Sequence, residues 1–221
     1  MDYTRYGIYF TPSETGFAEA GAAWLGWDIR TGAPLEAPQP DYTARPRKYG
    51  FHATLKPPFK LAQGKTEAAL VLATQDLATK LTPVPLGKLT LSRIGSFLAW
   101  TCAQPNTALQ DLATATVQEL DTFRAPATDE DIAKRLKPGM SDAHIRHLHN
   151  WGYPYVMECF RFHMTLTGPV PKSEATRVAE LAEAHFINAL PDHISIDALT
   201  LVGEMPCGNF KEVARVPLAG A

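Results

Sequence analysis

The chain has 221 residues, of which 45% are hydrophobic and 20% charged, and its formal net charge is −2. This is the composition of an ordinary globular protein, with enough apolar material for one large domain or two small lobes. The slightly acidic balance argues against general binding to nucleic acids or membrane surfaces, which a strongly basic chain would favour, but leaves room for a local basic site.

The cysteines and the apolar segments indicate a compartment. Cys102, Cys159 and Cys207 are scattered without a Cys-x-x-Cys pair, and an odd number of thiols fits a reducing environment better than a disulfide framework. The first residues resemble no signal peptide, and no apolar stretch approaches the length of a membrane span. We therefore expect a cytoplasmic protein without a membrane partner.

The first predicted elements are a strand over residues 6–11 and a helix that ends near residue 24 or 25. Thr11, Pro12 and Glu14 predict the helix start, with Thr11 as the cap, Pro12 at the first helical position and Glu14 three residues after the cap. Residues 30–48 are rich in proline and predict an irregular segment. A loop of this length in a compact protein is usually functional or mobile.

One order of elements then occurs twice. The sequence Phe-His-Ala-Thr-Leu-Lys at residues 51–56 returns as Phe-His-Met-Thr-Leu-Thr at residues 162–167. The periodicity of apolar residues predicts a helix and two strands after each motif, at residues 66–81, 88–94 and 96–101, and again at residues 173–189, 194–202 and 210–216. Between the two units we expect helices at residues 106–122, 128–136 and 141–152.

This duplication predicts an α+β fold in a single bilobal domain with pseudo-twofold symmetry. Each lobe would be an antiparallel sheet backed by helices, with the active-site cleft between the lobes. The first lobe would comprise about residues 1–104, the connecting helices about residues 105–156, and the second lobe about residues 157–221.

The two motifs read as strands in which alternate side chains face opposite ways. One face is apolar and suits the core, with Phe51, Ala53, Leu55, Phe160, Phe162, Met164 and Leu166. The other face carries His52, Thr54 and Lys56 in the first strand and Arg161, His163, Thr165 and Thr167 in the second. A pseudo-twofold arrangement would bring two His/Thr pairs together across one cleft.

Two histidines and two hydroxyls suit the cleavage of a phosphodiester. Histidine has an unperturbed pKa near 6.5, so one ring can act as a base while the other is a protonated acid. Threonine hydroxyls can donate hydrogen bonds to the non-bridging oxygens, where charge builds in the transition state. The sequence therefore predicts His52, Thr54, His163 and Thr165 as catalytic residues, with no cofactor and no metal.

Cations and aromatic residues near the motifs predict the binding residues. Residues 42–66 carry six cations and no Asp or Glu, namely Arg45, Arg47, Lys48, Lys56, Lys60 and Lys65. They indicate an anion site or else a solvated surface. Lys56 is the best candidate on the His52 face and Arg161 opposite it, with Arg47 and Tyr49 at the rim. Tyr153 and Tyr155 either stack on a ring of the substrate or pack the lobe junction, where Trp151 is expected.

The paired motifs His52-Ala-Thr54 and His163-Met-Thr165 resemble those of the two-histidine (2H) phosphoesterase superfamily. That superfamily includes cyclic nucleotide phosphodiesterases and RNA 2′,3′-cyclic phosphodiesterases with RNA-ligase-like activity. The resemblance covers most of the chain, because a helix and a hairpin follow each motif. It implies a bilobal α+β fold with the site between the lobes, and the catalytic roles given above.

A closer resemblance rests on residues 45–59, which include Arg45-Pro-Arg47-Lys-Tyr49-Gly-Phe-His52, on Trp151-Gly-Tyr-Pro-Tyr155 and on residues 160–168. These segments are similar to an uncharacterised bacterial branch of the superfamily, whose genes often lie in phosphonate-utilisation operons. By analogy with those operons, the resemblance implies a phosphoribosyl cyclic phosphate as substrate.

A metal site is the alternative for the histidines of the third connecting helix. His144 and His147 are three residues apart and can be neighbours, but His149 would point elsewhere and Asp142 is the sole flanking carboxylate. A polar helix face is favoured over a metal site. His185 and His193 are expected to be peripheral.

The leading hypothesis is thus a metal-independent phosphoesterase that hydrolyses a small cyclic phosphate of a ribose or nucleotide. One alternative is a non-catalytic protein that binds an RNA end or a nucleotide in the same cleft. Another is a metal-dependent hydrolase that uses the histidines at residues 144–149. A purely structural role would leave the two matched histidines without a reason.

Overall fold

The computed structural model describes residues 3–220 and is built on one antiparallel sheet of seven strands, in the order β11-β10-β1-β4-β8-β7-β6. The strands are β1 (Tyr6–Phe10), β4 (Ala53–Phe59), β6 (Leu89–Ile94), β7 (Phe97–Cys102), β8 (Met164–Thr165), β10 (Ala198–Glu204) and β11 (Phe210–Pro217). Two small sheets pair β2 (Trp27–Asp28) with β3 (Ala33–Pro34) and β5 (Val84–Pro85) with β9 (Ser195–Ile196).

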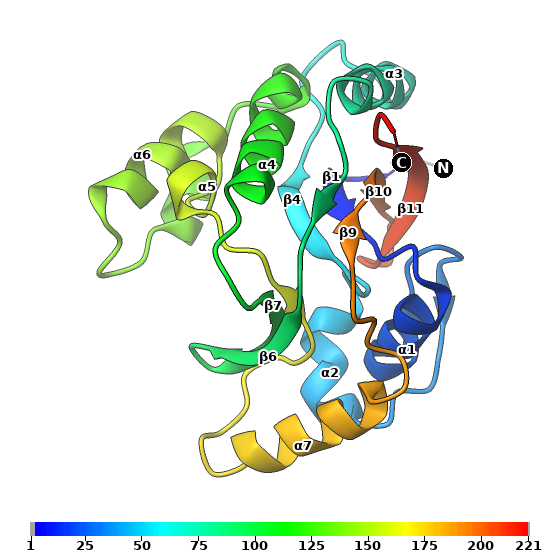
Figure 1. The fold of residues 1–221 in the computed structure, drawn as a ribbon. Helices are drawn as coiled ribbons and strands as arrows, with labels where there is room; N and C mark the ends of the chain where they lie inside the picture. The colour runs from blue at the N-terminus through cyan, green and yellow to red at the C-terminus, as the bar shows by residue number, and fades with distance from the viewer. Residues whose placement is uncertain (1–2, 221) are drawn as a thin grey trace.

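The helices form groups around this sheet. They are α1 (Thr15–Leu25), α2 (Pro40–Arg47), α3 (Glu67–Ala78), α4 (Thr107–Glu119), α5 (Asp129–Arg135), α6 (Asp142–Trp151) and α7 (Ala175–Phe186), with 3-10 turns η1 (Asp121–Phe123) and η2 (Met157–Cys159). Helices α1, α2 and α7 gather at the lower end of the molecule in Figure 1, and α3 and α4 lie at the upper end. None of the described helices is long and apolar enough to cross a membrane.

The hairpins exchange partners between the two sequence units. Hairpin β6–β7 follows the first motif in the chain but pairs with β8, the strand of the second motif. Hairpin β10–β11 follows the second motif but pairs with β1, which lies beside β4. The two motif strands meet at the centre through Ala53 and Met164. The expected α+β class with antiparallel pairing is confirmed, and the two halves share one sheet.

The apolar face of both motif strands lies in the core, as the alternation predicts. Ala53, Leu55, Met164 and Leu166 are each at most 1% exposed. Phe51 packs edge-to-face on Phe17 of α1, with 5.0 Å between ring centroids, so α1 covers this face of the sheet. Burial of this face fixes which way the alternate residues point, and therefore directs the histidines and threonines to the other side.

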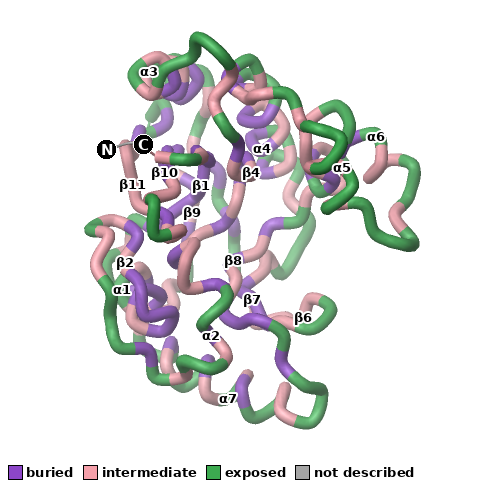
Figure 2. The backbone as a smooth tube through the Cα atoms, turned by 180° about the vertical axis from the view of Figure 1, so that it is seen from behind, coloured by how far each residue is buried: buried purple, intermediate pink, exposed green. Residues whose placement is uncertain are grey.

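Helices α5 and α6 bury few of their residues. Helix α5 contains no buried residue, and only His147 and Leu148 are buried in α6. Figure 2 shows the two helices standing out at one side of the molecule, with α4 between them and the sheet. This segment therefore contributes little to the core.

Two local expectations were wrong. The first helix begins at Thr15, with Glu14 at the cap position, because the Thr11 hydroxyl is buried in a 2.8 Å hydrogen bond with Thr200. The proline-rich segment at residues 30–48 contains α2, with Pro40 in the first turn. Proline is tolerated there because the first amide groups of a helix have no acceptor within it.

Candidate active site

The central strand pair places the four catalytic candidates on one face. Ala53 and Met164 are antiparallel partners, so one residue to either side His52 stands opposite Thr165 and Thr54 stands opposite His163. Opposed residues in such a pair have Cβ atoms about 5 Å apart, and diagonal ones about 7–8 Å apart. The two histidines are diagonal neighbours, which leaves room for a phosphate group between their rings.

The ring of His52 is held by the backbone before it. Its Nδ1 lies 2.9 Å from the carbonyl oxygen of Gly50, and its Nε2 lies 3.1 Å from the hydroxyl of Thr54. Since a carbonyl only accepts hydrogen bonds, Nδ1 carries the proton and Nε2 of the neutral ring accepts from Thr54. Gly50 has φ of +70°, and a Cβ there would lie 2.6 Å from Ile29 Cβ, so the turn that aims this carbonyl requires glycine.

His163 repeats this arrangement. Its Nδ1 lies 2.8 Å from the carbonyl oxygen of Arg161, again two residues before the histidine. The carbonyl fixes the same tautomer, so Nε2 is the reactive nitrogen of both rings. The Phe97 ring lies beside His163, with 5.9 Å between centroids. The sequence duplication is therefore also a duplication of side-chain geometry.

Burial sets the protonation state of both rings. It lowers the pKa of His52 to about 4, although the bond to the Gly50 carbonyl acts in the opposite direction, and the nearby His163 lowers it further. Burial also lowers the pKa of His163, opposed by its bond to the Arg161 carbonyl. Both rings are thus neutral near pH 7 in the free protein. An anion bound between them would raise both pKa values and allow one ring to become the acid.

Tyr9 is part of this site, although the sequence analysis did not single it out. Its ring stacks on His52, with 3.8 Å between centroids, and its backbone pairs with Thr54 across the β1–β4 ladder. The side chain is fully buried, and its hydroxyl has no hydrogen-bond partner among residues 3–220. The signal was available in the strand alternation, because Tyr9 lies between the core residues Ile8 and Phe10.

A cavity of about 500 Å³ opens beside His52. Its walls come from the end of α2, from the β6–β7 turn and from the loop between α5 and α6, and its polar lining consists of Arg45, Tyr49, His52, Ser96, Lys137, Thr165 and Thr167. Among the expected binding residues, Tyr49 is the one that the described lining includes. Lys137 was missed, because it lies on a segment remote in sequence from both motifs.

The expectation for Lys56 was wrong. The residue is 1% exposed, and its ammonium donates to the carbonyl of Val117 at 2.9 Å and to Asp121 at 3.0 Å. Burial lowers its pKa to about 8, against the opposing effect of Asp121. The alternation directs Lys56 to the histidine face, but α4 covers that face at this point of β4. Lys56 therefore cannot reach a ligand between the histidines.

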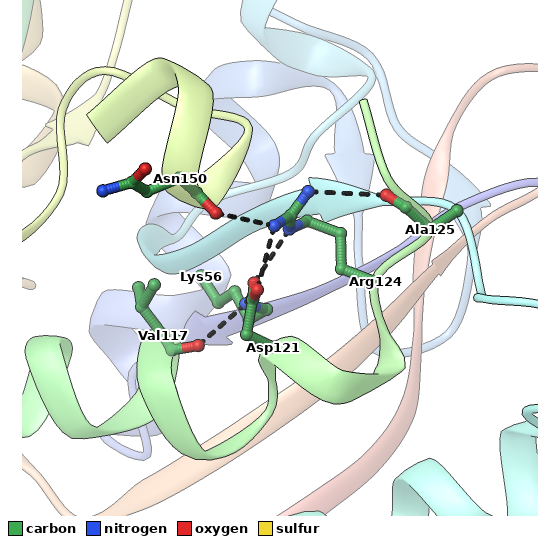
Figure 3. Close-up of polar contacts among 6 residues, drawn as sticks. All are labelled: Lys56, Val117, Asp121, Arg124, Ala125 and Asn150. Atoms are coloured by element: carbon green, nitrogen blue, oxygen red, sulfur yellow. Dashed lines mark hydrogen bonds and ion pairs between the residues drawn. The ribbon is translucent and has the colours of Figure 1, made fainter. Parts of the chain in front are cut away.

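Figure 3 shows what Lys56 does instead. Asp121 accepts from Lys56 and also from Arg124, whose Nε and Nη2 lie 2.8 and 2.9 Å from its two oxygens. Arg124 in turn donates to the carbonyl of Asn150 at 2.9 Å. This network ties β4, two residues after Thr54, to η1 and to the end of α6. It is a structural anchor for the strand that carries His52.

The remaining binding candidates lie around the site rather than in it. Arg47 donates to the carbonyl of Leu25 at 3.0 Å, which joins α2 to the end of α1. Arg161 is exposed and lines a separate hollow next to α4. Tyr153 and Tyr155 form an edge-to-face pair, and Tyr155 also packs on His144. These contacts favour the packing interpretation for the two tyrosines.

The three histidines of α6 do not converge. His144 bonds to the Ser141 hydroxyl at 2.7 Å and His149 is exposed, whereas His147 is buried with Nε2 2.9 Å from a carboxylate oxygen of Glu158. The potential ligand atoms of His147, Glu158 and Cys159 lie within 4.8 Å of one another. This group lies on α6 and η2, and none of its members lines the His52 cavity.

The other two histidines have no place in the site. A ring nitrogen of His185 lies 2.9 Å from the carbonyl of Ala20, and its ring packs against Trp24. This histidine therefore connects α7 to α1. His193 is exposed.

Comparison with solved structures gives two similar chains. One is described as "Crystal structure of phosphoesterase", with a TM-score of 0.46, and the other as the crystal structure of E. coli LigT complexed with 3′-AMP, with a TM-score of 0.47. Each is 13% identical to this chain, and each comparison covers 98% of this chain and 99% of the other.

Sequence comparison gives closer relatives. "Ribose 1,5-bisphosphate phosphokinase PhnN" of Janthinobacterium sp. (strain Marseille) is 35% identical over 98% of this chain, and the protein of that name in Laribacter hongkongensis (strain HLHK9) is 33% identical over 96%. The chain spans about half the length of both relatives, 51% in each case. Residues 54–211 match the family model described as "Protein of unknown function (DUF1045)". Because that match covers well over half of the chain, the protein belongs to the DUF1045 family.

Proposed function

We propose that this DUF1045 protein is a 2H-type phosphoesterase that opens a cyclic phosphodiester of a ribose or nucleotide. The observation that carries the proposal is the repeated geometry of His52 and His163. Each ring has its Nδ1 bound to the carbonyl two residues before it, and each presents Nε2 on the same face of the central strand pair. Two matched acid–base groups with a threonine beside each suit in-line attack on a phosphate.

The reaction follows from these positions. The neutral histidine takes a proton from a water molecule as the water oxygen forms a bond to phosphorus. The other histidine, protonated through the bound anion, gives its proton to the ring oxygen as the P–O bond breaks. When the substrate binds, Thr54 turns its hydroxyl from His52 Nε2 to a non-bridging oxygen of the phosphate, and Thr165 donates to another. The product is a phosphate monoester beside a free hydroxyl, and proton exchange with water restores the two rings.

The names of the relatives support a sugar substrate. Both are described as kinases that act on ribose 1,5-bisphosphate. Opening a 1,2-cyclic phosphate on ribose yields a ribose phosphate, the class of compound that such a kinase consumes. We therefore propose a phosphoribosyl cyclic phosphate in phosphonate metabolism as the substrate. A cavity of about 500 Å³ is of the size that accommodates a small sugar phosphate or a mononucleotide.

The test is phosphate-ester hydrolysis followed by 31P NMR in the presence of EDTA. The panel holds 2′,3′-cyclic nucleotides and a ribosyl 1,2-cyclic phosphate, and it compares the parent with His52→Ala and His163→Ala. We expect ring opening by the parent and a kcat about 10²–10⁴-fold lower in each variant. His193→Ala is the matched control, because His193 is exposed and outside the site. Full turnover in both site variants would overturn the proposal.

A non-catalytic nucleotide or RNA-end binder is the second candidate. Among residues 3–220 the cavity lining contains cations and no carboxylate, which suits anion binding with or without catalysis. Binding of an RNA end with a steep loss of affinity as salt increases, together with no turnover across the panel, would favour this candidate. Turnover of any cyclic phosphate that depends on both histidines would exclude it.

A further inference from the structure

Two cations in the His52 cavity are not explained by the histidine pair. Arg45 lies in α2, and Lys137 lies in the loop between α5 and α6. Both side chains are exposed, and within residues 3–220 neither charged group has an ion pair or hydrogen bond. Seven of the described cations form ion pairs, namely Arg5, Lys56, Lys80, Arg124, Lys134, Arg146 and Arg215. Arg45 and Lys137 thus belong to the unpaired remainder and are distinguished by their place in the cavity lining.

The surroundings of Arg45 and Lys137 are suited to an anion. No Asp or Glu is among the described residues that line the cavity, and the other polar groups there include hydroxyls of Ser96, Thr165 and Thr167. Cations and hydroxyl donors together would stabilise a bound anion through hydrogen bonds and charge attraction. No carboxylate of the described lining would repel it.

The position of Arg45 is fixed by the second motif. The amide of Gly168 donates to the carbonyl of Tyr42 at 2.7 Å, so α2 is attached to the chain directly after Thr167. A Cβ at Gly168 would lie 3.3 Å from the Cβ of Arg45, which shows how closely the arginine approaches this strand end. Arg45 is thus held beside the cavity on the side away from Thr54.

The cavity is larger than one phosphate requires. At about 500 Å³ the cavity, which is lined by His52 and Thr165 at the catalytic end, has room for a sugar and a second phosphate. We propose that Arg45 and Lys137 form a second anion subsite, which binds a terminal phosphate monoester of the substrate. This inference rests on the proposed function and assigns two residues of this chain to the further phosphate that a phosphoribosyl substrate carries.

The first experiment compares matched substrates. Ribose 1,2-cyclic phosphate is paired with its 5-phosphorylated form, and adenosine 2′,3′-cyclic phosphate is paired with its 5′-phosphorylated form. We expect the parent to prefer the phosphorylated member of each pair at least about tenfold in kcat/KM, since a hydrogen bond to a charged group is worth about that factor or more. Arg45→Met and Lys137→Met should each reduce this ratio, mainly through KM for the phosphorylated member.

Lys134→Met is the matched control. It removes an exposed cation from α5, one that already pairs with Glu130 at 2.6 Å, and the substrate preference should remain that of the parent. Turnover of both members of each pair without preference would overturn the second subsite and leave the phosphoesterase proposal intact. A preference that survives both Arg45→Met and Lys137→Met would also overturn it.

A binding experiment tests the subsite independently of turnover. Calorimetry with ribose 5-phosphate should show saturable binding to the parent and to Lys134→Met. The affinity of Lys137→Met for this ligand should be lower than that of the parent by about tenfold or more. Equal affinity in the parent and in both subsite variants would overturn the inference. Absence of turnover on all cyclic phosphates, with this binding pattern present, would contradict the phosphoesterase proposal alone.

Discussion

The ring of Tyr9 stacks on the imidazole of His52, with 3.8 Å between the centroids and 21° between the planes. The tyrosine is fully buried on β1 and covers one face of the histidine ring. Water is therefore kept from that face, and burial is the main cause of the low pKa of His52. Tyr9 thus acts on the proposed chemistry through His52 rather than through its own hydroxyl.

Replacing Tyr9 should change the titration of His52. We expect Tyr9→Ala to raise the pKa of His52 from about 4 towards its ordinary value near 6.5, because water would reach the exposed ring face. The measurement is an NMR pH titration of the histidine ring signals. The acidic limb of the pH–activity profile should move to higher pH together with the ring titration.

Tyr9→Phe is the matched control, since it keeps the stacked ring and removes only a hydroxyl that has no partner among the described residues. It should titrate like the parent. An unchanged His52 titration in Tyr9→Ala would show that the stack does not set this pKa.

Stability should fall in mildly acidic solution. His52 has a pKa of about 4 in the folded protein and about 6.5 when unfolded, so between these values the unfolded chain binds more protons. The free energy of unfolding therefore decreases as the pH falls from about 6.5 to about 4, by up to about 3 kcal/mol from His52. The lowered pKa of His163 acts in the same direction. Urea unfolding at pH 7 and pH 5 measures the change.

His52→Gln should flatten this pH dependence, because glutamine does not titrate and is close in size to histidine. The exposed His193 serves again as the control, and His193→Gln should keep the slope of the parent. Equal stability of the parent at pH 7 and pH 5 would contradict the prediction.

The sequence predicted local structure well where burial alone decides it. The alternation in both motifs correctly predicted that Ala53, Leu55, Met164 and Leu166 are in the core. It thereby placed the histidines and threonines on the other face. What it could not predict was strand pairing. Nothing in the hairpin at residues 89–102 indicates that it pairs with β8 rather than with β4, because cross-strand contacts depend on packing between distant segments.

Lys56 illustrates the same limit. Its place in the alternation was correct, but the pattern carries no information on what lies above that face. Helix α4 covers it and supplies Val117 as an acceptor, while Asp121 follows in η1. Lys137 is the converse case, since a loop remote from both motifs brings it to the cavity. The position of Tyr9 in the site could have been predicted, because this aromatic residue lies on the same face of the predicted first strand as Thr11, opposite the core residues Ile8 and Phe10.

Asp121→Ala should destabilise the protein more than Lys56→Met does. Removing the carboxylate leaves the Lys56 ammonium buried with the Val117 carbonyl as its remaining acceptor, and breaking such a pair typically costs about 3–5 kcal/mol. Replacing Lys56 by methionine removes the buried charge itself and keeps the apolar stem. Thermal or urea unfolding of the two variants measures the difference.

The same variants test whether Lys56 binds substrate. If it is an anchor only, Lys56→Met should change KM for a cyclic phosphate little, whereas a direct phosphate contact would raise KM about tenfold or more. Lys134→Met, on the exposed face of α5, is the control for loss of a cation. A large increase in KM with unchanged stability would restore Lys56 to the binding site.

Chelation should leave turnover unchanged. The proposed reaction uses the Nε2 atoms of His52 and His163 for proton transfer, while the group with metal-ligand character, His147, Glu158 and Cys159, lies on α6 and η2 away from the cavity lining. We therefore expect the same kcat before and after dialysis against EDTA. His147→Ala should also keep the kcat of the parent. Because the substitution removes a buried ring, urea unfolding of the variant and the parent checks that the variant is folded. The prediction would be contradicted if EDTA abolished turnover by the parent, if added zinc restored it, and if His147→Ala were inactive. Catalysis would then have to be assigned to a metal-dependent site.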